Sequence, residues 1–168
     1  MAELVPAEKI TGEAVLVTET RAGKYQVEVK AGPSTFFADE PAAVGGLGSG
    51  PGPYDLLGAA LGACTVMTLR LYADRKQWPL TQAHAKVVHR RTSLQARDVF
   101  IRNIHLEGPL DDTQRARLLE IANRCPVHVT LERGADITTS LVSEDALNGT
   151  DMATGTGHMT TMEEAGSV

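Results

Sequence analysis

The feature that most constrains this 168-residue chain is an apolar segment at residues 54–76. Its apolar residues recur at the three- and four-residue steps of an α-helix. The residues at these steps are Leu56, Leu57, Ala60, Leu61, Cys64, Met67, Thr68 and Leu71. Because charges return only from Arg70 onward, we expect a helix that is buried nearly all round. Pro79 ends it, since proline cannot continue a helix without losing a hydrogen bond.

Small residues fill much of the remaining circumference of this helix, among them Gly58 and Gly62. Each glycine costs about 1 kcal/mol of helix propensity relative to alanine. Something must offset that cost. The natural candidate is another backbone packed closely against the helix.

Three short strands are predicted before the helix, at residues 13–18, 24–30 and 34–38. A glycine in the turn at 20–23 supplies the freedom that a tight hairpin needs. Residues 40–53 are so rich in glycine and proline that no regular element survives there, and we expect a loop. This loop lacks the order of strand, lysine-bearing glycine motif and helix that a phosphate-binding loop requires.

Two further strands are predicted after the helix, at 82–91 and 98–107. The apolar residues of the second strand change phase, which predicts a bulge near Arg102 or Asn103. Strands that arrive in adjacent runs indicate an α+β fold with mostly antiparallel pairing.

A second helix at 111–124 begins with Asp111 and Gln114, which have the spacing of a capping box. Pro126 favours a break of this helix at Cys125. The alternation of apolar residues at 137–141 predicts a last strand.

Charge separates the end of the chain from the rest. The formal net charge is −5, and residues 143–168 hold five acids and no lysine or arginine, so residues 1–142 are neutral. This balance argues against a general nucleic-acid binder. We expect one domain at 1–142 and a mobile, acidic tail at 143–168 that is rich in glycine, threonine and methionine.

The chain is expected to be soluble. Its longest uncharged run in the apolar segment has fourteen residues, from Leu56 to Leu69, and a membrane-spanning helix needs about 20. The first residues lack the basic-then-apolar order of a signal peptide. We therefore expect a cytoplasmic protein without membrane partners.

Cys64 and Cys125 are the two cysteines, and they lie 61 positions apart. In a reducing compartment such a pair is a free thiol pair, a metal site or a redox couple. Cys64 lies in the most apolar segment, where a cysteine most often packs as a small hydrophobe. Cys125 precedes Pro126, so it fits a helix N-cap, where unpaired N–H groups favour a thiolate. His128 either adds positive charge there or makes no contact with the thiol.

Metal and cofactor sites are not indicated. No pair of cysteines has the close spacing of a zinc site, and the five histidines show no metalloprotease pattern. We expect neither a metal nor a cofactor.

Four segments carry a resemblance to a known family: residues 52–65 (GPYDLLGAALGACT), 124–128 (RCPVH), 39–41 (DEP) and 67–73 (MTLRLYA). The first two resemble the two cysteine motifs of the OsmC/Ohr family of thiol peroxidases, and the other two resemble its OsmC-like branch. The resemblance covers roughly residues 12–142. It implies an intertwined homodimer with antiparallel sheets packed around a long buried central helix.

The resemblance also implies a reaction. Cys64 would be the peroxidatic thiolate, which attacks an organic hydroperoxide, or less well hydrogen peroxide, and becomes a sulfenic acid. Cys125 would then form an intrasubunit disulfide with it, and a thiol or dithiol would reduce the pair. Such an enzyme would serve in oxidative stress defence.

Two charged residues follow from the same resemblance. Family members place an arginine from the N-terminal hairpin at the thiolate, and Arg21 is the best match. Ohr-type members carry a glutamate where this chain has Tyr54. Asp55 is adjacent, but nine residues along a continuous helix turn it about 180° from Cys64. Either the helix bends near Gly58, or Glu40 is the acid, or this branch has none.

A second function is kept open. An OsmC-like dimer could bind a small apolar ligand or sense oxidants without turnover, and the missing glutamate and the unusual tail favour this alternative.

Overall fold

The computed structural model describes residues 14–148 and 157–165. They form two compact units. The N-terminal unit runs to Gly52 and includes the segment from Ala135 to Gly157. The C-terminal unit contains Pro53–Gly134 and the chain from His158 onward. Each unit is described by itself below.

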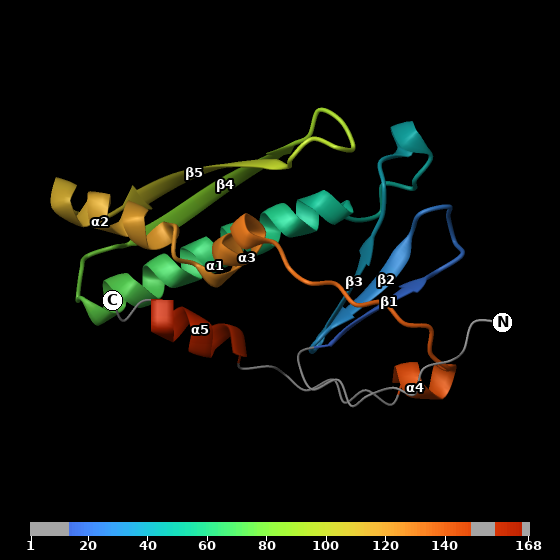
Figure 1. Ribbon diagram of the computed structural model, residues 1–168. Helices are drawn as coiled ribbons and strands as arrows, with labels where there is room; N and C mark the ends of the chain where they lie inside the picture. Colours follow the sequence, from blue (N-terminus) through green and yellow to red (C-terminus); the bar gives the residue numbers. More distant parts are fainter. Residues whose placement is uncertain (1–13, 149–156, 166–168) are drawn as a thin grey trace. The chain divides into compact units, whose positions relative to one another are not determined.

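The N-terminal unit contains an antiparallel meander of three strands, β1 (Val15–Glu19), β2 (Val27–Ala31) and β3 (Ser34–Ala38), as predicted (Figure 1). The turn between β1 and β2 is wider than predicted, because the Thr20 N–H donates to the Gln26 carbonyl and β2 begins only at Val27. Arg21, and not Gly23, takes the left-handed backbone conformation in this turn, with φ 62°.

The glycine-rich segment after β3 forms a loop, as predicted, around the buried carboxylate of Asp39. This carboxylate accepts hydrogen bonds from the amides of Glu40, Leu47 and Ser49 and from the Ser49 hydroxyl. Burial alone would raise the pKa of Asp39, but these hydrogen bonds outweigh it and hold the pKa below its ordinary value. The glycines here let backbone pack on backbone, since a Cβ on Gly46 would collide with the Glu40 carbonyl. A short 3-10 helix, η1 (Ala42–Val44), lies inside the loop.

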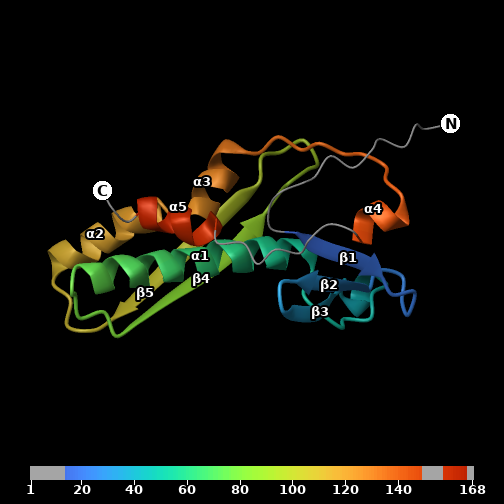
Figure 2. The same ribbon diagram turned by 90° about the horizontal axis from the view of Figure 1, so that it is seen from below.

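The C-terminal unit is built on the long helix α1 (Pro53–Arg75). It packs against an antiparallel hairpin of β4 (Gln82–Arg90) and β5 (Val99–Glu107) and against α2 (Asp112–Ala122) and α3 (Pro126–Arg133) (Figure 2). Asp111 and Gln114 form the predicted capping box at the start of α2.

Register in the hairpin is continuous, from Gln82 opposite Glu107 to Arg90 opposite Val99. The predicted bulge near Arg102 or Asn103 was therefore wrong. The inward-facing residues of β5 include Phe100, Ile104 and Leu106, which pack against the core. Arg102 lies between Phe100 and Ile104 on the same inward face. This one polar residue interrupts the apolar alternation, which is why the sequence pattern resembled that of a bulge.

One face of α1 forms the core of this unit. Its buried residues are Leu61, Cys64, Thr65, Thr68, Leu69, Tyr72 and Ala73. By length and composition α1 could span a membrane, but a buried core helix meets the same criteria, and one face of α1 packs on β4, α2 and α3. On the other face Ala59, Ala63 and Met67 are exposed in the single chain.

The predicted strand at 137–141 was wrong. Residues 135–143 have no regular structure, and Ile137 and Leu141 are exposed, because no neighbouring strand pairs with them in the described structure. The predicted domain boundary after residue 142 stays a prediction.

Two helices follow, α4 (Glu144–Asn148) and α5 (Gly157–Ala165), so the described part of the tail is not irregular as expected. Residues 149–156 lie outside the described residues. In α5, His158, Met162 and Ala165 are the less exposed positions. Their spacing places them on one face of the helix, which gives α5 a side on which to pack.

Candidate active site

The two cysteines lie together in the C-terminal unit. Cys64 and Cys125 form one buried cluster with Leu61, and Cys64 is only 2% exposed. Val87 and Phe100 of the hairpin and two residues of α3 pack around it. Both cysteines are free thiols, and their sulfurs lie close enough for each to shift the pKa of the other.

Local sequence explains how each sulfur reaches this cluster. Cys64 is one helical turn from Leu61 and from Thr68, on the buried face of α1. Cys125 is the N-cap of α3, as predicted, with Pro126 at the first helical position. Its sulfur accepts the backbone N–H of His128 at 3.4 Å. The imidazole of His128 pairs instead with Glu132, at 3.7 Å.

Arg102 on β5 is a site residue that the sequence did not reveal. Its Nη1 donates to the Thr65 hydroxyl at 2.8 Å and lies 4.0 Å from the sulfur of Cys125. Its Nη2 donates to the Asn123 side chain at 2.9 Å. These partners fix the guanidinium beside the sulfur. The signal was its position on the inward-facing side of a half-buried strand, where a charged residue needs a partner.

Of the two cysteines, Cys125 is the one whose thiolate is favoured. Its pKa is lowered to about 5, first by the hydrogen bond from Cys64, against the effect of burial. The His128 N–H, the Thr65 hydroxyl and the charge of Arg102 lower it further. The pKa of Cys64 is raised, first by its hydrogen bond to Cys125 and then by burial. Of the two sulfurs, Cys125 is therefore the one that ionises more readily.

Two other groups contact the sulfur of Cys64. The backbone N–H of Val127, in α3, donates to it at 3.5 Å. The Nε2 atom of His158, in α5, lies 3.4 Å from it. The sequence did not single out His158, which lies 94 positions from Cys64.

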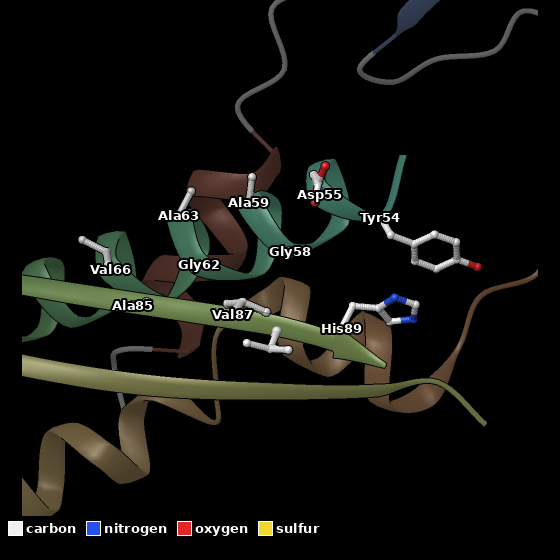
Figure 3. Close-up of a pocket in the computed structure, with 11 residues that line it drawn as sticks. Tyr54, Asp55, Gly58, Ala59, Gly62, Ala63, Val66, Ala85, Val87 and His89 are labelled. Atoms are coloured by element: carbon white, nitrogen blue, oxygen red, sulfur yellow. The ribbon is translucent and has the colours of Figure 1, made fainter. Parts of the chain in front are cut away.

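Asp55 and Tyr54 lie in another part of this unit. α1 is continuous from Pro53, so the bend near Gly58 is not found, and Asp55 is about half a turn away from Cys64 around the helix. Both residues line an open cavity of about 770 Å³ between α1 and β4, together with Gly58 and Gly62 (Figure 3). The structure does not bring Asp55 to either sulfur.

The ring of Tyr54 stacks on His89, with centroids 4.2 Å apart and planes within 6° (Figure 3). Asp98 pairs with His89 at 2.7 Å. Tyr54 therefore serves in ring stacking.

Arg21 and Glu40 belong to the N-terminal unit. The Arg21 side chain is 82% exposed and lies 3.6 Å from Glu19. Within the described residues, 14–148 and 157–165, no group of three or more histidine, cysteine or acidic side chains is arranged to hold a metal ion.

Comparison with solved structures shows the fold. A putative osmotic stress induced and detoxification response protein from Psychrobacter arcticus is 21% identical, with a TM-score of 0.63, and the match covers 72% of this chain and 90% of that one. An OsmC like protein from Mycoplasma pneumoniae is 18% identical, with a TM-score of 0.62 and coverage of 80% and 99%. An organic hydroperoxide resistance protein OsmC from Legionella pneumophila is 20% identical, with a TM-score of 0.57 and coverage of 81% and 100%.

Curated protein sequences gave no significant match. The family model for OsmC-like protein matches residues 46–140, which is more than half of the chain and includes both cysteines. This match agrees with the fold comparisons and with the sequence motifs, and it shows that the chain belongs to the OsmC-like protein family.

Proposed function

We propose that this protein is a cysteine-dependent peroxidase that reduces organic hydroperoxides, and hydrogen peroxide less well, in oxidative stress defence. The observation that carries the proposal is the pair of free cysteines in one buried cluster. The described organic hydroperoxide resistance function of the Legionella pneumophila relative supports the substrate class.

The two sulfurs would act in turn. Cys64 attacks the terminal oxygen of the hydroperoxide, the O–O bond breaks, and Cys64 becomes a sulfenic acid while an alcohol leaves. The Cys125 thiolate attacks the sulfur of this sulfenic acid, so that an S–S bond forms and hydroxide leaves, which takes a proton from the solvent to become water. The lowered pKa of Cys125 supports this order, because the second nucleophile is already a thiolate at neutral pH. A cellular thiol or dithiol then reduces the disulfide.

Apolar surroundings support an organic substrate. Leu61, Val87 and Phe100 pack around the sulfurs and would bury an alkyl group with a gain of about 25 cal/mol for each Å² of apolar surface.

Arg21 is proposed as the cation that approaches the reacting peroxide. Its backbone holds a left-handed conformation that non-glycine residues rarely adopt. The turn is also held in place, since Thr20 donates to the Gln26 side chain and Gln26 donates to Ser49. Such over-determined, strained residues cluster at functional sites. Asp55, which lies away from the sulfurs, would need a partner chain to take part.

We propose a homodimer in which a second copy covers the exposed small-residue face of α1. A Cβ on Gly62 would meet Val87 at 3.7 Å, an ordinary contact, so none of the described residues requires glycine there. A second α1 packed backbone to backbone would require it. We place the protein in the cytoplasm, where both cysteines stay reduced between cycles.

Hydroperoxide consumption tests the proposal. The wild-type protein should consume cumene hydroperoxide catalytically with dihydrolipoamide as reductant, and Cys64→Ser should abolish turnover. In Cys125→Ser, dimedone should trap a sulfenic acid at Cys64. The exposed variant His105→Gln serves as the control. Undiminished turnover in Cys64→Ser would refute the proposal. Consumption of one equivalent without cycling would select the non-catalytic sensor.

A further inference from the structure

We propose that His158, from the C-terminal helix α5, is a catalytic residue that takes the proton of Cys64 and returns it to the departing alcohol. This inference rests on the peroxidase function proposed above. His158 lies outside residues 46–140, which the family model matches.

The need for such a group follows from the resting site. A thiol must lose its proton before it attacks a peroxide, because the thiolate is the nucleophile. Here the neighbouring Cys125 sulfur and burial both raise the pKa of Cys64, so the neutral thiol is the favoured form of this residue. Cys125 is a weak base, since its pKa is lowered to about 5. It does not readily take the proton at neutral pH.

Among the described residues at the Cys64 sulfur, His158 is suited to this task. The Val127 amide at 3.5 Å can only donate. The Nε2 atom of His158 is 3.4 Å away, within hydrogen-bonding reach of a sulfur. Imidazole is the side chain that gains and loses a proton near neutral pH, and one nitrogen can accept while the other donates.

The helix that carries His158 is attached to the C-terminal unit at two further points. Met162, one turn later on the same face, is 2% exposed. Arg75, at the end of α1, donates to the backbone carbonyl of Glu163 at 3.0 Å. Figures 1 and 2 both show α5 alongside α1. The imidazole is thus anchored by a buried side chain and a hydrogen bond that take no part in the chemistry.

The proton balance closes without an outside acid. Nε2 takes the proton from the sulfur of Cys64, which gives a thiolate and an imidazolium. The thiolate forms a bond to the hydroxyl oxygen of the hydroperoxide, the O–O bond breaks, and the alkoxide takes the imidazolium proton and leaves as an alcohol. Cys64 is then a sulfenic acid and His158 is neutral again. General acid–base catalysis of this kind contributes about 10²- to 10⁴-fold.

Two readouts test the proposal in the full-length protein. The first is the rate at which iodoacetamide modifies Cys64 at pH 7, followed by mass spectrometry of its peptide. The second is kcat/KM for cumene hydroperoxide. His158→Ala should lower both by about 100-fold, and added imidazole should restore part of the loss. His158→Gln should be as slow, because an amide keeps a hydrogen-bond donor but cannot exchange the proton. His105→Gln, which alters an exposed histidine on β5, should match the wild type.

Met162→Asp provides an independent variant, since a buried charge would detach α5. It should lower kcat/KM as much as His158→Ala does, and the double variant should be no slower than either single variant. Unchanged rates in His158→Ala would overturn the proposal. Faster turnover in either variant would also overturn it, because α5 would then merely obstruct the sulfur. If the wild type has no peroxidase turnover, the proposed function fails, whereas the iodoacetamide rates still decide the role of His158.

Discussion

The two faces of α1 differ in how completely one chain occupies them. On the cysteine face, Cys64 is buried, and each sulfur has named hydrogen-bond partners from α3. On the opposite face, Gly58 and Gly62 line an open cavity beside β4, and Ala63 is exposed. The comparison teaches that one face of α1 is completed within a single chain, by the second sulfur at the start of α3, while the opposite face of the same helix stays open in that chain.

Replacement of Arg102, whose guanidinium lies beside the Cys125 sulfur, should have the largest effect on the cysteine face of α1. In Arg102→Met, the pKa of Cys125 should rise, because the cation beside its sulfur is lost. Disulfide formation from the Cys64 sulfenic acid should slow by about fivefold at pH 5, because a rise of about one pKa unit lowers the thiolate fraction of Cys125 from about one half to about one tenth. Stopped-flow measurement of the intermediate checks this, with Arg97→Met as the control. An unchanged rate would show that the helix N-cap alone sets the thiolate.

The second-largest effect should come from acid, which should lower the stability of the folded protein through Cys125. The folded pKa of Cys125 is about 5 and lies below that of a free thiol, so between these values the unfolded chain binds more protons. Stability therefore rises with pH across this window and is lost as the pH falls through about 5. Above pH 9 the raised pKa of Cys64 reverses the sign, since the unfolded thiol ionises first.

Thermal melting under reducing conditions checks this prediction. The wild type should exceed Cys125→Ser in melting temperature by more at pH 8 than at pH 5. An equal difference at both pH values would contradict a buried thiolate at Cys125.

A single methyl group on the opposite face should have the smallest effect. Gly62→Ala should raise the stability of the helix by up to about 1 kcal/mol. It should also weaken the dimer, because the added Cβ separates the two copies. Analytical ultracentrifugation measures the dissociation constant, with Met159→Ala on α5 as the control. Tighter association in Gly62→Ala would argue that no backbone approaches this face.

The same two faces show what the sequence could predict. The periodicity around Cys64 predicted α1, and Pro126 predicted the N-cap at Cys125, because both signals depend on neighbouring residues. The contact between His158 and Cys64 joins residues far apart in the chain. No local pattern encodes such a contact.

Arg102 was missed for a different reason. Its charge interrupted an apolar alternation, and the interruption was interpreted as a bulge. The strand at 137–141 failed because alternation alone does not supply a partner strand. Polar residues at inward-facing positions therefore deserve a test as site residues before the backbone is assumed to break.

The hydrogen bonds that begin at the buried Asp39 carboxylate have a consequence for the effects of mutations in the glycine-rich loop. They run through Ser49 and Gln26 to Thr20, the neighbour of Arg21. A mutation at Ser49 would disturb the conformation of the turn that contains Arg21 without altering Arg21 itself. Under the proposed peroxidase function, genetic screens for lost peroxide tolerance would then return changes in the glycine-rich loop that resemble folding defects.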